Sequence, residues 1–231
     1  MSNEQTAAIY SHKILILDFG SQYTQLIARR IREIGVYCEI FSCECSDQEV
    51  IDFAPNGIIL SGGPETVTSD DTPRAPECVF TLGVPVLGIC YGMQTMTEQL
   101  GGRVAASDHR EFGYAQVRAR GHSKLLVGIE DSSSAEGYGL LDVWMSHGDR
   151  IEVLPPGFRS MAYTENSPLA VMGNEEGTMF GIQFHPEVVH TPQGAEILKN
   201  FVFGVCKAVG DWTPANFVSD TVARIREQVG D

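Results

Sequence analysis

The chain has 231 residues, with 16 Lys or Arg against 30 Asp or Glu, so its formal net charge is −14. A negative charge of this size argues against a surface that follows nucleic-acid phosphates and against docking on an anionic membrane. The start of the chain is polar and no apolar run is long enough to cross a bilayer, so neither a secretory signal nor a membrane span is expected.

Short runs of Val, Ile and Leu in the first half predict the strands of a parallel sheet. Near-continuous apolarity is typical of strands that are covered on both faces. A helix with one apolar stripe is predicted over residues 21–35, and it joins the first two strands into a right-handed βαβ unit. The strands are predicted over residues 13–18, 36–41, 57–61 and 85–90.

In the second half, strand-like runs follow one another without long helices, which predicts an antiparallel or mixed portion. Two later helices are each predicted to start at a Thr-Pro pair, with Thr191 and Thr213 as N-caps. We therefore expect a three-layer α/β/α domain over residues 1–209 and an appended connector helix over residues 210–231. The later strands are predicted over residues 115–119, 141–145, 159–163, 169–172 and 179–184.

The pentapeptide GICYG, residues 88–92, joins a predicted buried strand to a predicted helix. This is the pattern of a nucleophile elbow, with sulfur in place of the serine oxygen. A helix N-terminus favours the thiolate, which is the reactive form of cysteine. We therefore predict Cys90 as a nucleophile. The other five cysteines are interpreted as free thiols of a cytoplasmic protein, with no disulfide and no metal site.

A cysteine nucleophile needs a base that is held by a third group. His185 closes a predicted strand, and the proline after it favours an extended conformation. Positions two apart in an extended chain share a face, so Glu187 can accept from one imidazole nitrogen and leave the other for sulfur. The spacing alone is a loose pattern, and the elbow cysteine elsewhere in the chain strengthens it.

The segment SGGP, residues 61–64, follows the third predicted strand. A turn there can present a backbone N–H at the carboxyl edge of the sheet, where ligands of α/β proteins bind. Gly63 could thus face Tyr91, and their two N–H groups could bind an oxyanion. The alternatives are a plain turn or a nucleotide site. No GxxxxGK[ST] or GxGxxG pattern occurs, and residues 64–66 break the phosphate-loop pattern of ATP pyrophosphatases.

The segments SGGP, GICYGMQ, MSHGD and QFHPEV occur in that order and together resemble the class I glutamine amidotransferases of the triad type. The resemblance covers nearly the whole chain. It implies a flavodoxin-like three-layer fold with a mostly parallel central sheet and an additional antiparallel portion. It also implies hydrolysis of L-glutamine by Cys90, His185 and Glu187, with Gly63 and Tyr91 as the oxyanion hole.

The same resemblance implies the residues that hold the substrate. Gln94, one helical turn after the cysteine, would hold the glutamine amide. Ser146, Gly148 and Asp149 would hold the amino and carboxylate ends of glutamine.

Within that family, four segments are similar to the amidotransferase domains of GMP synthases: residues 18–33, 110–117, 140–149 and 212–231. This implies a carbon–nitrogen ligase of purine biosynthesis that uses ammonia from glutamine and ATP to convert XMP to GMP. An ATP pyrophosphatase (synthetase) domain would follow residue 231. ATP and Mg²⁺ are expected only there, with no cofactor in the present domain, and that part would form a homodimer.

Three alternatives stay open from the sequence. The chain could be the separate glutaminase subunit of a two-subunit enzyme. It could be a cysteine hydrolase for another γ-glutamyl substrate, although Gln94 and the MSHGD segment favour free glutamine. It could also be a non-catalytic regulatory domain that keeps the fold, which the complete Cys90, His185 and Glu187 set disfavours.

Overall fold

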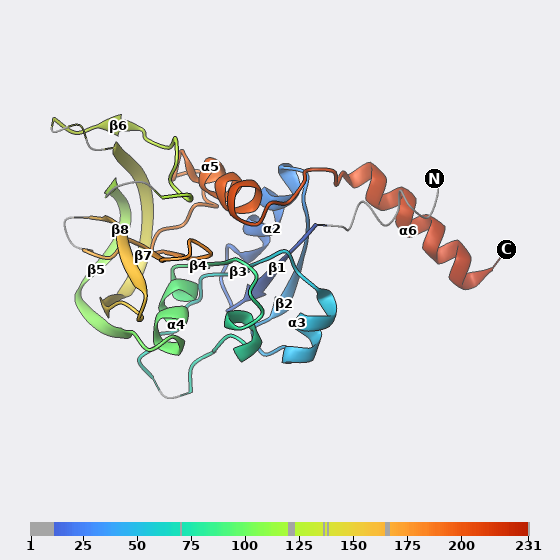
Figure 1. The fold of residues 1–231 in the computed structure, drawn as a ribbon, viewed down its shortest axis with the longest axis horizontal. Helices are drawn as coiled ribbons and strands as arrows, with labels where there is room; N and C mark the ends of the chain where they lie inside the picture. The colour runs from blue at the N-terminus through green and yellow to red at the C-terminus, as the bar shows by residue number, and fades with distance from the viewer. Residues whose placement is uncertain are drawn as a thin grey trace.

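The fold is built on one ten-stranded sheet with the strand order β2-β1-β3-β4-β10-β9-β8-β5-β7-β6 (Figure 1). The structure is a computed structural model, and it describes residues 12–69, 71–119, 123–135, 137, 139–164 and 167–230. The side chains of residues 107–110, 224 and 227 lie outside that description.

Five neighbouring strands form a parallel half of the sheet. Their alternate side chains enter two different apolar clusters: in the first strand, Ile14 and Ile16 pack on one face and Leu15 and Leu17 on the other. Both faces are therefore covered, as the near-continuous apolar runs predicted. The strands are β1 (Lys13–Asp18), β2 (Tyr37–Ser42), β3 (Gly57–Leu60), β4 (Val86–Ile89) and β10 (Met179–Ile182).

Helices cover both faces of this half, which confirms the predicted three-layer arrangement. One face carries α2 (Thr24–Glu33), α5 (Gly194–Lys199) and the π-helical η2 (Asn200–Val205). The opposite face carries α3 (Asp47–Phe53), the 3₁₀ helix η1 (Glu77–Phe80) and α4 (Tyr91–Gln99). Figure 1 shows α2 and α5 on the side of the sheet opposite to α3 and α4.

The remaining strands form an antiparallel portion. The two longest extend well beyond the predicted 115–119 and 141–145, because they pair with each other along most of their length. Cross-strand pairing thus recruits Ser, Asp, His and Gly residues that have little strand preference of their own. The strands are β5 (Arg103–Ala119), β6 (Ser132–Ser133), β7 (Gly139–Val153), β8 (Phe158–Tyr163) and β9 (Val171–Asn174).

The β5–β7 pairing is interrupted once. Ala106 pairs with Asp149, and the next paired residue of β5, Glu111, pairs with His147. The chain therefore advances by five residues in β5 but by only two in β7. This is a large bulge, and such bulges often lie beside functional sites because they redirect side chains.

The two predicted Thr-Pro helix starts have different outcomes. The Thr213 hydroxyl accepts from the N–H of Asn216 at 3.2 Å, and Pro214 is the first residue of α6 (Pro214–Val229), as predicted. The prediction for Thr191 is wrong: α5 begins at Gly194 and has no side-chain cap. The Thr191 hydroxyl is already bonded to other backbone groups, as described below.

Helix α6 extends away from the sheet and its covering helices (Figure 1). Phe217 packs near its base, with ring centroids 6.3 Å from Tyr37 and 6.2 Å from Trp212. The predicted apolar stripe of α6 is exposed, with side-chain exposures from 41% to 79%; it consists of Val218, Val222, Ile225 and Val229. The division into a domain over 1–209 and a connector over 210–231 stays a prediction.

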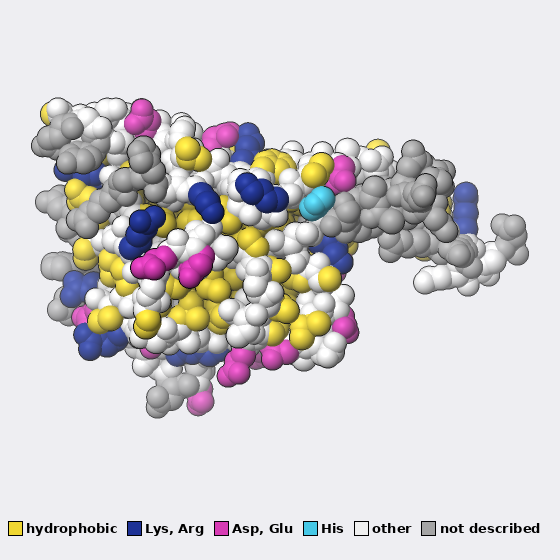
Figure 2. Space-filling view, viewed as in Figure 1, with side chains coloured by type: hydrophobic (Ala, Val, Ile, Leu, Met, Phe, Trp, Pro, Cys, Tyr) yellow, Lys and Arg dark blue, Asp and Glu magenta, His cyan; other side chains and the backbone are white. Residues whose placement is uncertain are grey.

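On the face shown in Figure 2, Lys and Arg side chains are interspersed with Asp, Glu and apolar side chains. Among the described residues, no helix has the length and apolarity to cross a bilayer.

Candidate active site

Three neighbouring parallel strands end at the same edge of the sheet and place the predicted site residues side by side. In register, Leu60 of β3 lies opposite Gly88 of β4, and Ile89 of β4 lies opposite Ile182 of β10. The residues that follow these strands must therefore meet at one edge. This is where ligands of α/β sheets bind, and it brings the SGGP turn, Cys90 and His185 together.

Cys90 lies in a strained turn between β4 and α4, with φ 52° and ψ −109°. The flanking glycines are required sterically. A Cβ at Gly88 would lie 2.6 Å from the carbonyl oxygen of Gly92, and one at Gly92 would lie 2.3 Å from that of Leu60. The turn has the geometry of a nucleophile elbow, where such strain exposes the nucleophile.

His185 and Glu187 form the buried pair that the sequence predicted. The imidazole Nδ1 lies 2.7 Å from Oε1 of Glu187, and both residues are almost fully buried. Burial alone lowers the pKa of His185. Hydrogen bonds to Cys90 and to the Glu187 carboxylate outweigh it and raise that pKa to about 10. The raised pKa favours the protonated imidazole.

The SGGP turn packs tightly against His185 and against Tyr91, the residue that follows Cys90. A Cβ at Gly62 would lie 3.1 Å from Cε1 of His185. At Gly63 it would lie 2.7 Å from the carbonyl oxygen of Phe19 and 3.2 Å from Cγ of Tyr91. The two glycines thus allow the turn to reach the nucleophile. The binding of an oxyanion by the amides of Gly63 and Tyr91 stays a prediction.

A cavity of about 450 Å³ opens at Cys90. Its size is within the range typical of small-molecule sites. All six residues that were predicted to bind the oxyanion or glutamine line it. The lining consists of Gly63, Pro64, Glu65, Thr66, Cys90, Tyr91, Gln94, Ala106, Phe112, Ser146, His147, Gly148 and Asp149.

Side chains predicted to hold glutamine already bond to protein groups. Nε2 of Gln94 donates to the Asp149 carbonyl at 3.2 Å and to Oε1 of Gln183 at 3.4 Å. The Asp149 carboxylate accepts from the hydroxyl of Thr66 at 2.5 Å. The carbonyl oxygen of Ser146 lies 3.4 Å from the Cys90 sulfur. The structure therefore brings Gln94, Ser146 and Asp149 to the same cavity. Their roles in binding glutamine stay predictions.

The sequence interpretation missed a buried pair behind the MSHGD segment. His147 Nδ1 lies 2.9 Å from the carbonyl oxygen of Asp149, and its Nε2 lies 3.0 Å from the Glu111 carboxylate. The Asp149 carbonyl, which accepts from Gln94, is therefore also bonded to His147. Only the β5–β7 register, which places Glu111 opposite His147, reveals it.

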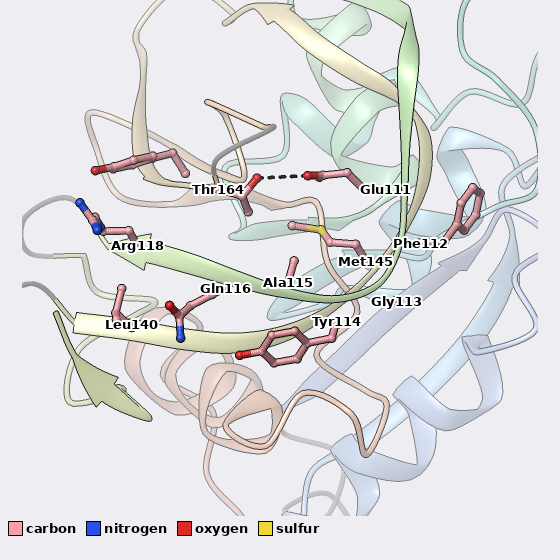
Figure 3. A pocket seen from close by; sticks show the side chains of 11 residues that line it. Glu111, Phe112, Gly113, Tyr114, Ala115, Gln116, Arg118, Leu140, Met145 and Thr164 are labelled. Carbon is pink, nitrogen blue, oxygen red and sulfur yellow. Dashed lines mark hydrogen bonds between the residues drawn. The ribbon is translucent and has the colours of Figure 1, made fainter.

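A second pocket, of about 710 Å³, lies on the antiparallel portion (Figure 3). The Thr164 hydroxyl donates to Glu111 there at 3.3 Å, the dashed contact of Figure 3. Phe112 belongs to the linings of both pockets, and its side chain is 66% exposed. Glu111 lines this second pocket and bonds to His147, which lines the cavity at Cys90.

Comparison with known proteins identifies the family. The family model of glutamine amidotransferase class-I matches residues 15–205, which include all nine predicted site residues. The chain belongs to the class I glutamine amidotransferases. The amidotransferase fold also explains why the nucleophile and the base follow two adjacent parallel strands.

This amidotransferase is 64% identical over 225 residues to the GMP synthase [glutamine-hydrolyzing] of Alkalilimnicola ehrlichii, covering 97% of this chain and 43% of the relative. The corresponding protein of Methylococcus capsulatus is 63% identical, covering 96% of this chain and 42% of the relative. The chain therefore spans less than half the length of these curated relatives.

A solved structure from Thermoplasma acidophilum, provisionally named as one subunit of a GMP synthase, is similar over 85% of this chain and 94% of that one. Its TM-score is 0.69 and its sequence is 30% identical. PurLQS from Thermotoga maritima shares the fold at a TM-score of 0.64 and 15% identity, with 82% of this chain and 97% of that one covered. Both solved chains are thus matched over nearly their whole length.

Proposed function

We propose that this amidotransferase is the glutaminase portion of a GMP synthase. It would hydrolyse L-glutamine to glutamate and ammonia. The observation that carries the proposal is the buried Glu187–His185 pair, whose imidazole interacts with an elbow cysteine that lines a cavity of about 450 Å³. The names and the 58% to 64% identities of the long relatives support the choice of GMP synthase within the family.

The proposed reaction is acyl transfer through a thioester. The Cys90 thiolate attacks the γ-carboxamide carbon of glutamine, and the amides of Gly63 and Tyr91 bind the oxyanion. His185 then gives its proton to the leaving ammonia, and water attacks the thioester to release glutamate. Each oxyanion donor would lower the barrier by about 3 kcal/mol.

The proposed consumer of the ammonia is an ATP pyrophosphatase (synthetase) portion that binds ATP and Mg²⁺ and converts XMP to GMP. The first relatives have more than half of their length outside the match, which leaves room for such a portion. We place the enzyme in the cytoplasm, with no nucleic acid or membrane as a partner, and propose that it forms a homodimer through the synthetase portion.

A second arrangement has a specific observation in its favour. The match covers 94% of the T. acidophilum protein, so a protein of about this size, named as a subunit, also exists as a separate polypeptide. The reaction would be the same, with ammonia passed between two chains. The higher identity to the long relatives favours one polypeptide.

The direct test is to incubate the purified chain with L-glutamine and to measure glutamate and ammonia. Competition by glutamate analogues distinguishes free glutamine from other γ-glutamyl substrates. A chain that releases no ammonia from glutamine under any condition, including with its synthetase portion present, contradicts the proposal.

We also expect the isolated chain to be a weak glutaminase. Idle hydrolysis would waste glutamine, and one peptide flip at Gly63 would suffice to remove an oxyanion donor. Adding the synthetase portion with ATP and XMP should then raise hydrolysis by orders of magnitude. A full rate without the partner, and no response to it, would favour an autonomous glutaminase.

A further inference from the structure

The segment after the catalytic base folds back on itself. Gly194 lies so close to Pro186 that a Cβ there would be 1.9 Å from the Pro186 carbonyl oxygen, so only glycine fits. The N–H of Gly194 donates to the Thr191 carbonyl at 2.9 Å. The N–H of Thr191 donates to the Val188 carbonyl at 3.2 Å. This turn places the Thr191 side chain beside His185.

The hydroxyl of Thr191 completes a closed ring of hydrogen bonds. It donates to the His185 carbonyl at 2.7 Å and accepts from the Trp144 N–H at 3.1 Å. The His185 N–H in turn donates to the Trp144 carbonyl at 3.1 Å. We call these three bonds the Thr191 clasp. Thr191 is 3% exposed, so water cannot readily replace its hydroxyl.

The Thr191 clasp bonds the backbone of His185 beyond the end of strand β10. Strand β10 ends at Ile182, and the residue after His185 is a proline, which has no N–H to donate. Both backbone polar groups of His185 are nevertheless bonded through the clasp. Since Trp144 lies two residues before Ser146 in β7, the base is tied directly to the strand that lines the glutamine cavity.

We propose that Thr191 is a positioning residue of the glutaminase reaction. Its hydroxyl fixes the backbone of His185 against β7, so that the imidazole stays within reach of Cys90. Thr191 does not line the cavity and contacts no reacting atom. The inference rests on the proposed function. A hydroxyl is required because one atom must both donate and accept, and an apolar replacement leaves two buried backbone groups without partners.

The test compares Thr191→Val, which keeps the shape, with Thr191→Ser, which keeps the hydroxyl. In the Val variant we expect kcat for glutamine hydrolysis to fall roughly 10- to 100-fold, the effect of a small misplacement of a catalytic group, with KM unchanged. The Ser variant should recover most of the rate.

Thr97→Val is the matched control. Thr97 is also fully buried, donates to a backbone carbonyl at 2.8 Å and lies outside the cavity lining. It should lose stability without losing kcat. Equal kcat values in Thr191→Val and Thr97→Val, or a Ser variant as impaired as the Val variant, would overturn the proposal.

A second readout does not need glutamine. The rate at which iodoacetamide alkylates Cys90, measured by peptide mass spectrometry, should fall in Thr191→Val and recover in Thr191→Ser, because a misplaced imidazole can no longer act as the base for the thiol. If the wild-type chain hydrolyses no glutamine even with its synthetase portion, ATP and XMP present, but alkylation follows this order, the proposed function fails and the positioning of His185 by Thr191 stands.

Should Thr191→Val not fold, Thr191→Cys replaces it, since a thiol is a weaker donor and acceptor. Its alkylation rate at Cys90 should then lie below that of Thr191→Ser. Equal rates in the two variants would overturn the proposal.

Discussion

The parallel and antiparallel portions of the sheet contribute different parts of the candidate site. The turns after β3, β4 and β10 carry Gly63, Cys90 and His185, and at the first two positions sterically required glycines hold the turn. The antiparallel β7 carries Ser146, Gly148 and Asp149, which line the cavity around the nucleophile. The parallel half thus carries the predicted catalytic residues, and the antiparallel portion carries most of the residues predicted to hold glutamine.

Substitutions in the two portions should therefore affect different kinetic constants. A group used only in the transition state affects kcat, whereas a group that holds the ground state affects KM. Substitutions in the parallel half should therefore lower kcat. Substitutions behind β7 should raise KM for glutamine.

The largest effect is expected for Cys90→Ala in the parallel half. Glutamine hydrolysis should fall by on the order of 10⁴-fold or more, because no other group can form the thioester. The fold should persist, since one small residue replaces another at the elbow, and circular dichroism would check this. If the proposed synthetase portion is present, added ammonia should still support GMP formation. Turnover close to wild type would remove Cys90 from its role.

Glu187→Gln should have a smaller effect than Cys90→Ala. The carboxylate orients His185 without touching glutamine, so kcat should fall by roughly 10²-fold with little change in KM. His185→Ala serves as the comparison and should lose more, because it removes the base itself. Equal loss in both variants would show that Glu187 takes part more directly.

His147→Ala sharpens the comparison from the antiparallel side. It removes the imidazole partner of the Glu111 carboxylate, whose side chain is 11% exposed, and leaves the Asp149 carbonyl with its bond from Gln94. KM for glutamine should rise roughly tenfold while kcat changes little. Glu111→Gln, which can still bond to the imidazole, should be milder. A loss confined to kcat would contradict the division of labour between the two portions.

The stability of the chain should also depend on pH through His185. Because its folded-state pKa is raised to about 10, this stabilisation is complete below about pH 6.5, its unfolded value, and is lost as the pH rises toward 10. Glu187→Gln removes one cause of the raised pKa. The difference in free energy of unfolding between wild type and variant, from urea titrations, should thus shrink between pH 6.5 and 10. A constant difference would contradict this assignment.

The smallest effect is expected outside both portions, on the exposed stripe of α6. Val222→Lys and Ile225→Lys should leave the melting temperature and glutaminase rate of this chain unchanged, since both side chains are already 41% and 52% exposed. If α6 binds the synthetase portion, the same variants should weaken stimulation by that portion. A large drop in melting temperature would show instead that the stripe packs within this chain.

Local sequence was enough for the features that depend on neighbouring residues. Apolar runs predicted β1 and β4, the GICYG pentapeptide predicted the elbow, and His-Pro-Glu predicted the pair at residues 185 and 187. Ser46 and Glu49 form a capping box at the start of α3, a signal that could have located this helix. In each case the geometry follows from residues within one strand, turn or helical turn.

Only the tertiary structure decided the rest. The Glu111–His147 pair joins two residues that are 36 positions apart, through a strand register that contains a bulge. Such pairing cannot be inferred from single-strand patterns. Thr191 has the sequence pattern of an N-cap, but its hydroxyl is used by His185 and Trp144. A side chain that can bond in two ways takes the partner that folding brings nearest, and for Thr191 that partner is the backbone of His185, the predicted base.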